Sequence, residues 1–144
     1  MGQGTYRVAL MSLHPQYAAA ILAGEKTVEF RKRALAEDVR YVVMYATKPI
    51  AELVGVFRVA SQEIAEPESA WARFGHKGSI NREEFFRYFE GARAAVAISV
   101  DQVIAITPTV PLEAGTGIKH PPQSFQYLNE GPSVLADLQA QGPQ

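Results

Sequence analysis

The chain has 144 residues and a formal net charge of −1, and 47% of its residues are hydrophobic. This length and composition are typical of one globular domain, and the small net charge argues against a general polyanion binder. Because there is no cysteine, disulfides, thiolate metal sites and cysteine nucleophiles are excluded. We expect a single domain over residues 1–144, with its core at about residues 6–128 and a C-terminal extension over residues 129–144.

The N-terminus lacks the basic and then apolar order of a secretory signal. No apolar run approaches the ~20 residues that are needed to cross a bilayer. We therefore expect a cytoplasmic protein that has no membrane partner.

Charge is distributed unevenly along the chain. Residues 1–60 hold eight Lys and Arg against five Asp and Glu, a balance of +3, and residues 61–144 hold six against ten, a balance of −4. The first part can therefore present a basic surface, although Lys and Arg equally serve to solvate strand edges.

The first 31 residues predict strand, helix and strand. Residues 8–13 form an apolar run that His14-Pro15 ends, and Pro15 suits the first turn of a short helix that Gly24 would close. From Thr27 onward apolar and polar residues alternate, which indicates a half-buried strand.

Two further strands are predicted over residues 39–46 and 53–60, with Lys48-Pro49 marking the turn between them. Gly55 inside the later strand indicates a bend or a close approach of two backbones.

The middle of the chain predicts two short helices. Residues 67–75 form the first, and Asn81 caps the second, with Glu84 completing a capping-box pattern and Gly91 ending the helix. Aromatic residues are concentrated here, and we interpret them as packing of the two helices on the sheet, with Trp71 as a possible lid or stacking residue. They are Trp71, Phe74, Phe85, Phe86, Tyr88 and Phe89.

The last part begins with a long β-rich run over residues 94–106. Residues 113–122 predict a loop, and residues 123–128 fit either a strand or one helical turn. A short helix is expected around residues 134–138, and residues 142–144 are expected to fray.

This order predicts the α+β class: a curled, mostly antiparallel sheet with a helix after the first strand and two short helices inserted before the last long strand. Strand and helix alternate too rarely for a doubly wound sheet.

The segment from Met11 to Arg31 resembles the ASCH family, whose pattern is roughly Gly-x-Lys-x-x-Glu-x-Arg. Here the pattern is met by Gly24, Lys26, Glu29 and Arg31. Flanking stretches are also similar, so the resemblance covers roughly residues 8–128. It implies a small PUA-like β-barrel with a polar cleft beside the first helix and a function in RNA recognition.

Some members of that family are hydrolases of N4-acetylated cytidine nucleosides, and some are ribonucleases. The resemblance implies that such hydrolases use a lysine at the position of Lys26, a threonine three residues later and a glutamate from the later helical region. In this chain Glu29 stands at the threonine position, and the later position falls near Gly78, beside Lys77. Glu83 or Glu84 are the candidates to replace that glutamate.

Three charged residues are the main candidates for the cleft. Lys26 could contact a phosphate or an acyl oxygen, and if buried it could act as a base or nucleophile. The alternative is a solvated lysine in a turn. Glu29 and Arg31 lie two apart on one strand face. They fit contacts to a base edge and a phosphate, or else a structural ion pair with Lys26.

Three hydroxyl residues complete the predicted site. Tyr45 and Thr47 end one strand on the same side, where Tyr45 fits either base stacking or barrel core. Ser124 fits either a phosphate donor or a cap of its own turn.

His14, His76 and His120 have no ligand spacing, and no nucleotide or dinucleotide fingerprint is present, so we expect no metal and no cofactor. The order of hypotheses is a module that binds RNA or a nucleotide-like ligand, then a hydrolase or ribonuclease with Lys26 and Glu29 as catalytic residues, then a protein-interaction domain. The oligomeric state is not predicted.

Overall fold

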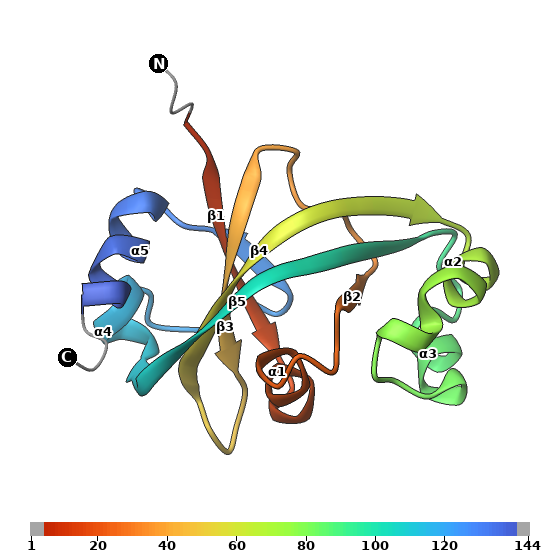
Figure 1. Cartoon of the computed structure of the whole chain (residues 1–144), viewed down its shortest axis with the longest axis horizontal. Helices are drawn as coiled ribbons and strands as arrows, with labels where there is room; N and C mark the ends of the chain where they lie inside the picture. Colours follow the sequence, from red (N-terminus) through yellow and green to blue (C-terminus); the bar gives the residue numbers. More distant parts are fainter. Residues whose placement is uncertain (1–4, 141–144) are drawn as a thin grey trace.

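A computed structural model of the chain describes residues 5–140 (Figure 1). Six strands form one sheet in the order β2-β5-β4-β3-β1-β6. Neighbouring strands run antiparallel except β1 and β3, which are parallel. The sheet curls into a half-barrel whose edges are β2 and β6, so the predicted curled and mostly antiparallel sheet is confirmed. The strands are β1 (Arg7–Leu13), β2 (Val28–Arg31), β3 (Val39–Ala46), β4 (Glu52–Ala65), β5 (Ala95–Pro111) and β6 (Phe125–Tyr127).

The helices gather at the two ends of the long β4–β5 pair (Figure 1). One end carries α2 and α3, the opposite end carries α4 and α5, and α1 follows β1 below the sheet. None of the helices within residues 5–140 has the length and hydropathy to cross a membrane. The helices are α1 (Pro15–Leu22), α2 (Pro67–Phe74), the 3₁₀ helix η1 (Gly75–Lys77), α3 (Arg82–Tyr88), α4 (Leu112–Thr116) and α5 (Gly131–Ala140).

Several local predictions are confirmed. Pro15 occupies the first turn of α1, and Gly24 adopts a φ of +80° just beyond its end. Asn81 caps α3, since its side-chain oxygen accepts the Glu84 backbone N–H at 2.8 Å. Gly55 lies where backbones and side chains meet closely, because a Cβ there would come within 2.7 Å of Leu22 Cδ2.

Other predictions are corrected. β4 and β5 extend well past residues 60 and 106 because they pair along most of their length as a ribbon. Backbone hydrogen bonds between the two strands hold this ribbon together even where side chains such as Ile64, which is 66% exposed, are not buried. The pattern of apolar residues therefore does not show where the two strands end. Residues Leu112–Thr116 form α4 rather than a loop. Residues 123–128 contain strand β6, and the expectation for residues 142–144 lies outside the described residues.

Alternation along β1 divides the core between two faces of the sheet. Ala9 and Met11 pack into a first core with α1, whereas Val8 and Leu10 pack into a second core. The C-terminal extension reaches this second core through α5, where Leu135 is buried. A third core joins β2 to α2 and α3, so the aromatic concentration packs as predicted. Its buried members are Val28, Phe30, Ala70, Phe85, Phe89, Ala95 and Ala97.

Strand β2 is buried on both faces, and the prediction of a half-buried strand is therefore wrong. Val28 and Phe30 face the third core. The opposite face carries Glu29 and Arg31, which are only 6% and 8% exposed. Their burial directs attention to this face of the sheet.

Candidate functional site

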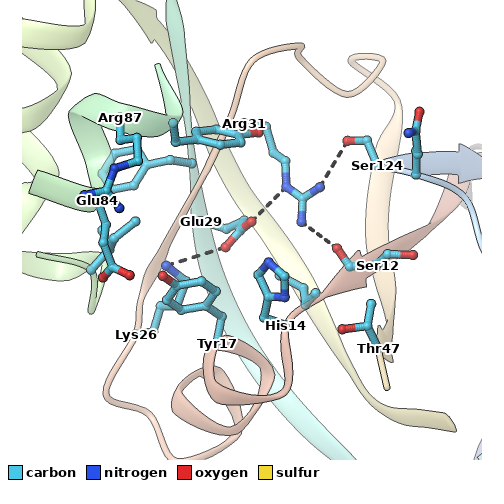
Figure 2. Close-up of a pocket in the computed structure, with 15 residues that line it drawn as sticks. Ser12, His14, Tyr17, Lys26, Glu29, Arg31, Thr47, Glu84, Arg87 and Ser124 are labelled. Atoms are coloured by element: carbon cyan, nitrogen blue, oxygen red, sulfur yellow. Dashed lines mark hydrogen bonds and ion pairs between the residues drawn. The ribbon is translucent and has the colours of Figure 1, made fainter. Parts of the chain in front are cut away.

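Charged side chains are buried at one place in the described part of the chain. Lys26, Glu29 and Arg31 are its buried charged residues, and Ser12 is buried beside them. Buried ions need partners, because an isolated charge loses several kcal/mol of hydration. The contacts of these side chains therefore define the site (Figure 2).

Lys26 lies in the short connection between α1 and β2, and its side chain is 3% exposed. Its ammonium donates to the carbonyl oxygen of Gly78 and lies 3.5 Å from Glu29 Oε1. The Tyr17 ring, from α1, lies 5.0 Å from Lys26 Nζ. Burial lowers the pKa of Lys26 below that of a solvated lysine, and the Glu29 carboxylate opposes this shift.

Arg31 is fixed through three of its nitrogens. Its Nε donates to Glu29 Oε2 at 2.8 Å, its Nη1 to Ser124 Oγ at 3.0 Å and its Nη2 to the Ser12 carbonyl oxygen at 2.8 Å. The loop before β6 is tied to β1, since Ser12 Oγ donates to the Pro122 carbonyl oxygen at 2.7 Å. β1, β2 and this loop therefore set the direction of one guanidinium.

The network carries one positive charge in excess, because the Glu29 carboxylate lies between two cations. A guanidinium has five N–H donors, and three of those of Arg31 are used, which leaves one on each terminal nitrogen. Lys26 has three donors and uses two of them. The site thus presents fixed donors to an anion in surroundings that screen charge poorly.

A pocket of about 420 Å³ opens over this network. Three cations and two carboxylates line it. Its other residues are polar, aromatic or aliphatic. Burial raises the pKa of the phenols of Tyr17 and Tyr88, so both remain donors at neutral pH. The lining residues are Ser12, Leu13, His14, Tyr17, Lys26, Glu29, Phe30, Arg31, Thr47, Ile80, Glu84, Arg87, Tyr88, Gln123 and Ser124.

The structure brings five of the six predicted site residues to this pocket: Lys26, Glu29, Arg31, Thr47 and Ser124. The ion pair of Lys26, Glu29 and Arg31, one of the two interpretations offered for them, is also present.

Tyr45 is the exception, and its placement in the cleft is corrected. Its side chain is 7% exposed and packs with Val43 in the second core, on the other face of the sheet. Thr47 reaches the pocket because the chain turns after Ala46, which ends the alternation on which the shared side was predicted.

Other lining residues were not predicted. His14 has no metal-ligand spacing in the sequence, yet it directly precedes the helix that borders the cleft. Arg87 and Tyr88 come from α3, as does the candidate Glu84, and the sequence predicts the aromatic residues of this helix as core packing. Their spacing of three and four residues, which places them on one helix face, is the signal that would have identified them. Of the alternatives for the later glutamate, Glu84 lines the pocket, and the Glu83 side chain is 84% exposed in solvent.

Trp71 does not line this pocket. It packs against the third core and borders a separate open hollow with His76 and Arg82. Within residues 5–140, no group of three or more His, Cys, Asp or Glu side chains is arranged to hold a metal ion.

Comparison with known proteins gives consistent matches. The ASCH domain matches residues 11–104 of this chain. A protein of Zymomonas mobilis described as an ASCH domain-containing ribonuclease is 31% identical over 126 residues, which cover 85% of this chain and 84% of that protein. The large ribosomal subunit protein uL22 of Ureaplasma parvum is 29% identical over 125 residues, which cover 86% of this chain and 40% of that protein.

The fold matches a solved structure as well. The crystal structure of ASCH from Zymomonas mobilis superposes with a TM-score of 0.82 and 29% sequence identity. The match covers 91% of this chain and 94% of that one. The likeness therefore extends over nearly the whole described chain.

Proposed function

Because the chain belongs to the ASCH domain family, we propose that it binds single-stranded RNA in the pocket above Lys26, Glu29 and Arg31 and cleaves the RNA backbone there. The observation that carries this proposal is the buried network with one excess positive charge and unused N–H donors. The relative described as a ribonuclease supports cleavage in addition to binding.

The network suits a phosphate. Arg31 keeps one donor on each of its terminal nitrogens, and this pair matches two oxygens of a phosphodiester. Water is largely excluded at this depth, since both Lys26 and Arg31 are less than a tenth exposed. A phosphate that enters the pocket therefore meets charge that is already oriented.

The rest of the pocket suits a nucleotide. A volume of about 420 Å³ lies within the range of small-ligand sites. Tyr17 and Tyr88 offer aromatic surface for a base, and Glu84 and Gln123 offer acceptors and a donor for base edges. Single-stranded RNA exposes the Watson–Crick edges of its bases, whereas a duplex uses these edges for pairing.

Cleavage would use the 2′-hydroxyl of the RNA itself. We assign His14 as the base that accepts the 2′-hydroxyl proton, since an imidazole nitrogen is the commonest general base in enzymes and His14 lines the pocket. The 2′-oxygen then attacks phosphorus, the bond from phosphorus to the 5′-oxygen breaks, and that oxygen takes a proton from solvent. Lys26 and Arg31 would stabilise the extra negative charge on the phosphoryl oxygens.

Hydrolysis of acetylated nucleosides is the weaker candidate. The threonine that such hydrolases use is replaced by Glu29, whose carboxylate is held between Lys26 and Arg31. The partner of the Lys26 ammonium near residue 78 is a backbone carbonyl rather than a carboxylate. Both observations weigh against transfer of that mechanism to this chain.

The test uses two single-stranded RNA oligonucleotides of the same sequence, one of them with a 2′-deoxyribose at the main cleavage position. We expect the all-ribose oligonucleotide to yield products that end in a 2′,3′-cyclic phosphate, with and without a metal chelator. The deoxy position should resist cleavage, and His14→Gln should slow cleavage by roughly 10²-fold or more. Binding of RNA without any cleavage product would reduce the proposal to an RNA-binding module, and absence of binding would overturn it.

A further inference from the structure

A row of cations stacked on aromatic rings begins at the rim of the pocket. Tyr88 lines the pocket, and Lys32 Nζ lies 4.6 Å from the centre of its ring. The neighbouring Arg33 places its guanidinium carbon 4.5 Å from the centre of the Phe125 ring. Phe125 directly follows Ser124, which binds Arg31. These cations therefore lie just outside the pocket on the segment that leaves β2.

The row continues along β6. The rings of Phe125 and Tyr127 have their centres 5.8 Å apart, and Tyr127 is 39% exposed. Arg7, at the start of β1, lies 5.1 Å from the centre of the Tyr127 ring and pairs with Asp38. We name Lys32, Arg33, Tyr88, Tyr127 and Arg7 the rim track.

Two charges of the rim track are not neutralised. Lys32 and Arg33 are exposed, and within residues 5–140 neither forms an ion pair with a carboxylate. Arg7, Arg58 and Arg73, by contrast, each contact one. Four of the eight Lys and Arg of the first 60 residues, Lys26, Arg31, Lys32 and Arg33, thus lie in the pocket or directly follow it in the chain.

Cations interleaved with exposed rings are what proteins use to hold single-stranded nucleic acid beyond a single nucleotide. Lys32 and Arg33 contact these rings through cation–π interactions, and both residues are exposed, so a ligand can reach them. A strand whose nucleotide lies in the pocket has further phosphates on either side, and these need such cations.

We infer that the rim track binds the phosphates of the nucleotides next to the one in the pocket, so that the protein selects single strands of several nucleotides over free nucleotides. This inference rests on the proposed function. Lys32 and Arg33 are its principal phosphate contacts, and Tyr127 offers a ring on which an adjacent base stacks.

The test compares the double variant Lys32→Gln/Arg33→Gln with the wild-type protein. Glutamine removes the charge and keeps most of the side-chain stem over Tyr88 and Phe125. The control Arg73→Gln/Lys119→Gln removes two charges from exposed positions that line neither pocket. The probes are a 2′-O-methyl oligonucleotide of about 12 nucleotides, which resists attack by the 2′-oxygen, and a dinucleotide of the same chemistry.

We expect the rim-track variant to bind the long oligonucleotide about tenfold more weakly, and the slope of log Kd against log salt to fall by roughly 1.4 for two lost phosphate contacts. Binding of the dinucleotide and the melting temperature should stay as in the wild type, and the control should match the wild type throughout. An unchanged Kd and slope for the long oligonucleotide, or an equal loss in the control, would overturn the rim track alone. Failure of the wild-type protein to bind either probe would overturn the proposed function as well.

Discussion

The two faces of the sheet are covered in different ways. On one face Val8, Leu10 and Val43 pack with Leu135 and Leu138 of α5 in a core of apolar side chains and one tyrosine. On the other face a first apolar core adjoins the buried charges of Lys26, Glu29 and Arg31. Both arrangements close the half-barrel, but only the second requires ions to lose their water.

This difference separates folding from function. A buried ion pair contributes little net stability, and apolar residues of similar volume often serve as well or better. The α5 face shows that this sheet closes without buried charge. The charged network is therefore better explained by a ligand than by the fold, and the two faces should respond differently to substitution.

The largest expected effect on stability comes from Glu29→Ala. Removal of this carboxylate leaves Lys26 and Arg31 as buried cations without their counter-ion, which should lower the free energy of unfolding by about 3–5 kcal/mol. Urea denaturation measures this loss. The control Glu83→Ala, whose side chain is 84% exposed, should stay within about 0.5 kcal/mol of the wild type. An equally small change for Glu29→Ala would show that Lys26 and Arg31 do not depend on Glu29 as their counter-ion.

Leu135→Ala tests the apolar face. It removes a buried side chain of α5 and should lower the free energy of unfolding by about 2–4 kcal/mol. Affinity for RNA, measured on folded protein at low temperature, should remain that of the wild type because the second core does not line the pocket. A matching loss of RNA affinity would mean that the two faces are coupled.

The smallest expected effect is a pH dependence. Burial lowers the pKa of Lys26 from 10.5, so between the lowered value and 10.5 the unfolded chain binds more protons than the folded one. Stability therefore rises with pH across this window, and below it the folded protein bears the full cost of the buried charge. The wild type should gain stability relative to Lys26→Met as the pH rises toward 10.5. A difference that stays constant or falls with pH would contradict the assigned cause.

Most of the fold and part of the site follow from local patterns. The sequence predicts β1, α1 and β3 because apolar runs mark the strands, and a proline and a glycine mark the ends of the helix, all within a few residues. The Gly-x-Lys-x-x-Glu-x-Arg pattern identifies three pocket residues for the same reason. The ends of β4 and β5 were missed because their length depends on pairing between distant segments.

Two further differences, the α3 residues in the pocket and the face on which Tyr45 lies, also depend on how distant segments pack. Glu84 and Arg87 line the pocket because α3 packs on β2. That packing cannot be read from local sequence patterns. Tyr45 follows strict alternation into the second core, so the error lay in assuming which face holds the cleft.

The most direct test measures two quantities on one variant, Lys26→Met: its rate of RNA cleavage and its free energy of unfolding. Methionine fills a similar volume, and Glu29 keeps its contact with Arg31, so stability should change by no more than about 1 kcal/mol. Cleavage of single-stranded RNA should fall by roughly 10²-fold or more, since a fixed cation at the pocket floor is lost. Cleavage at the wild-type rate in this variant, with the fold intact, would contradict the assignment of the buried network to RNA.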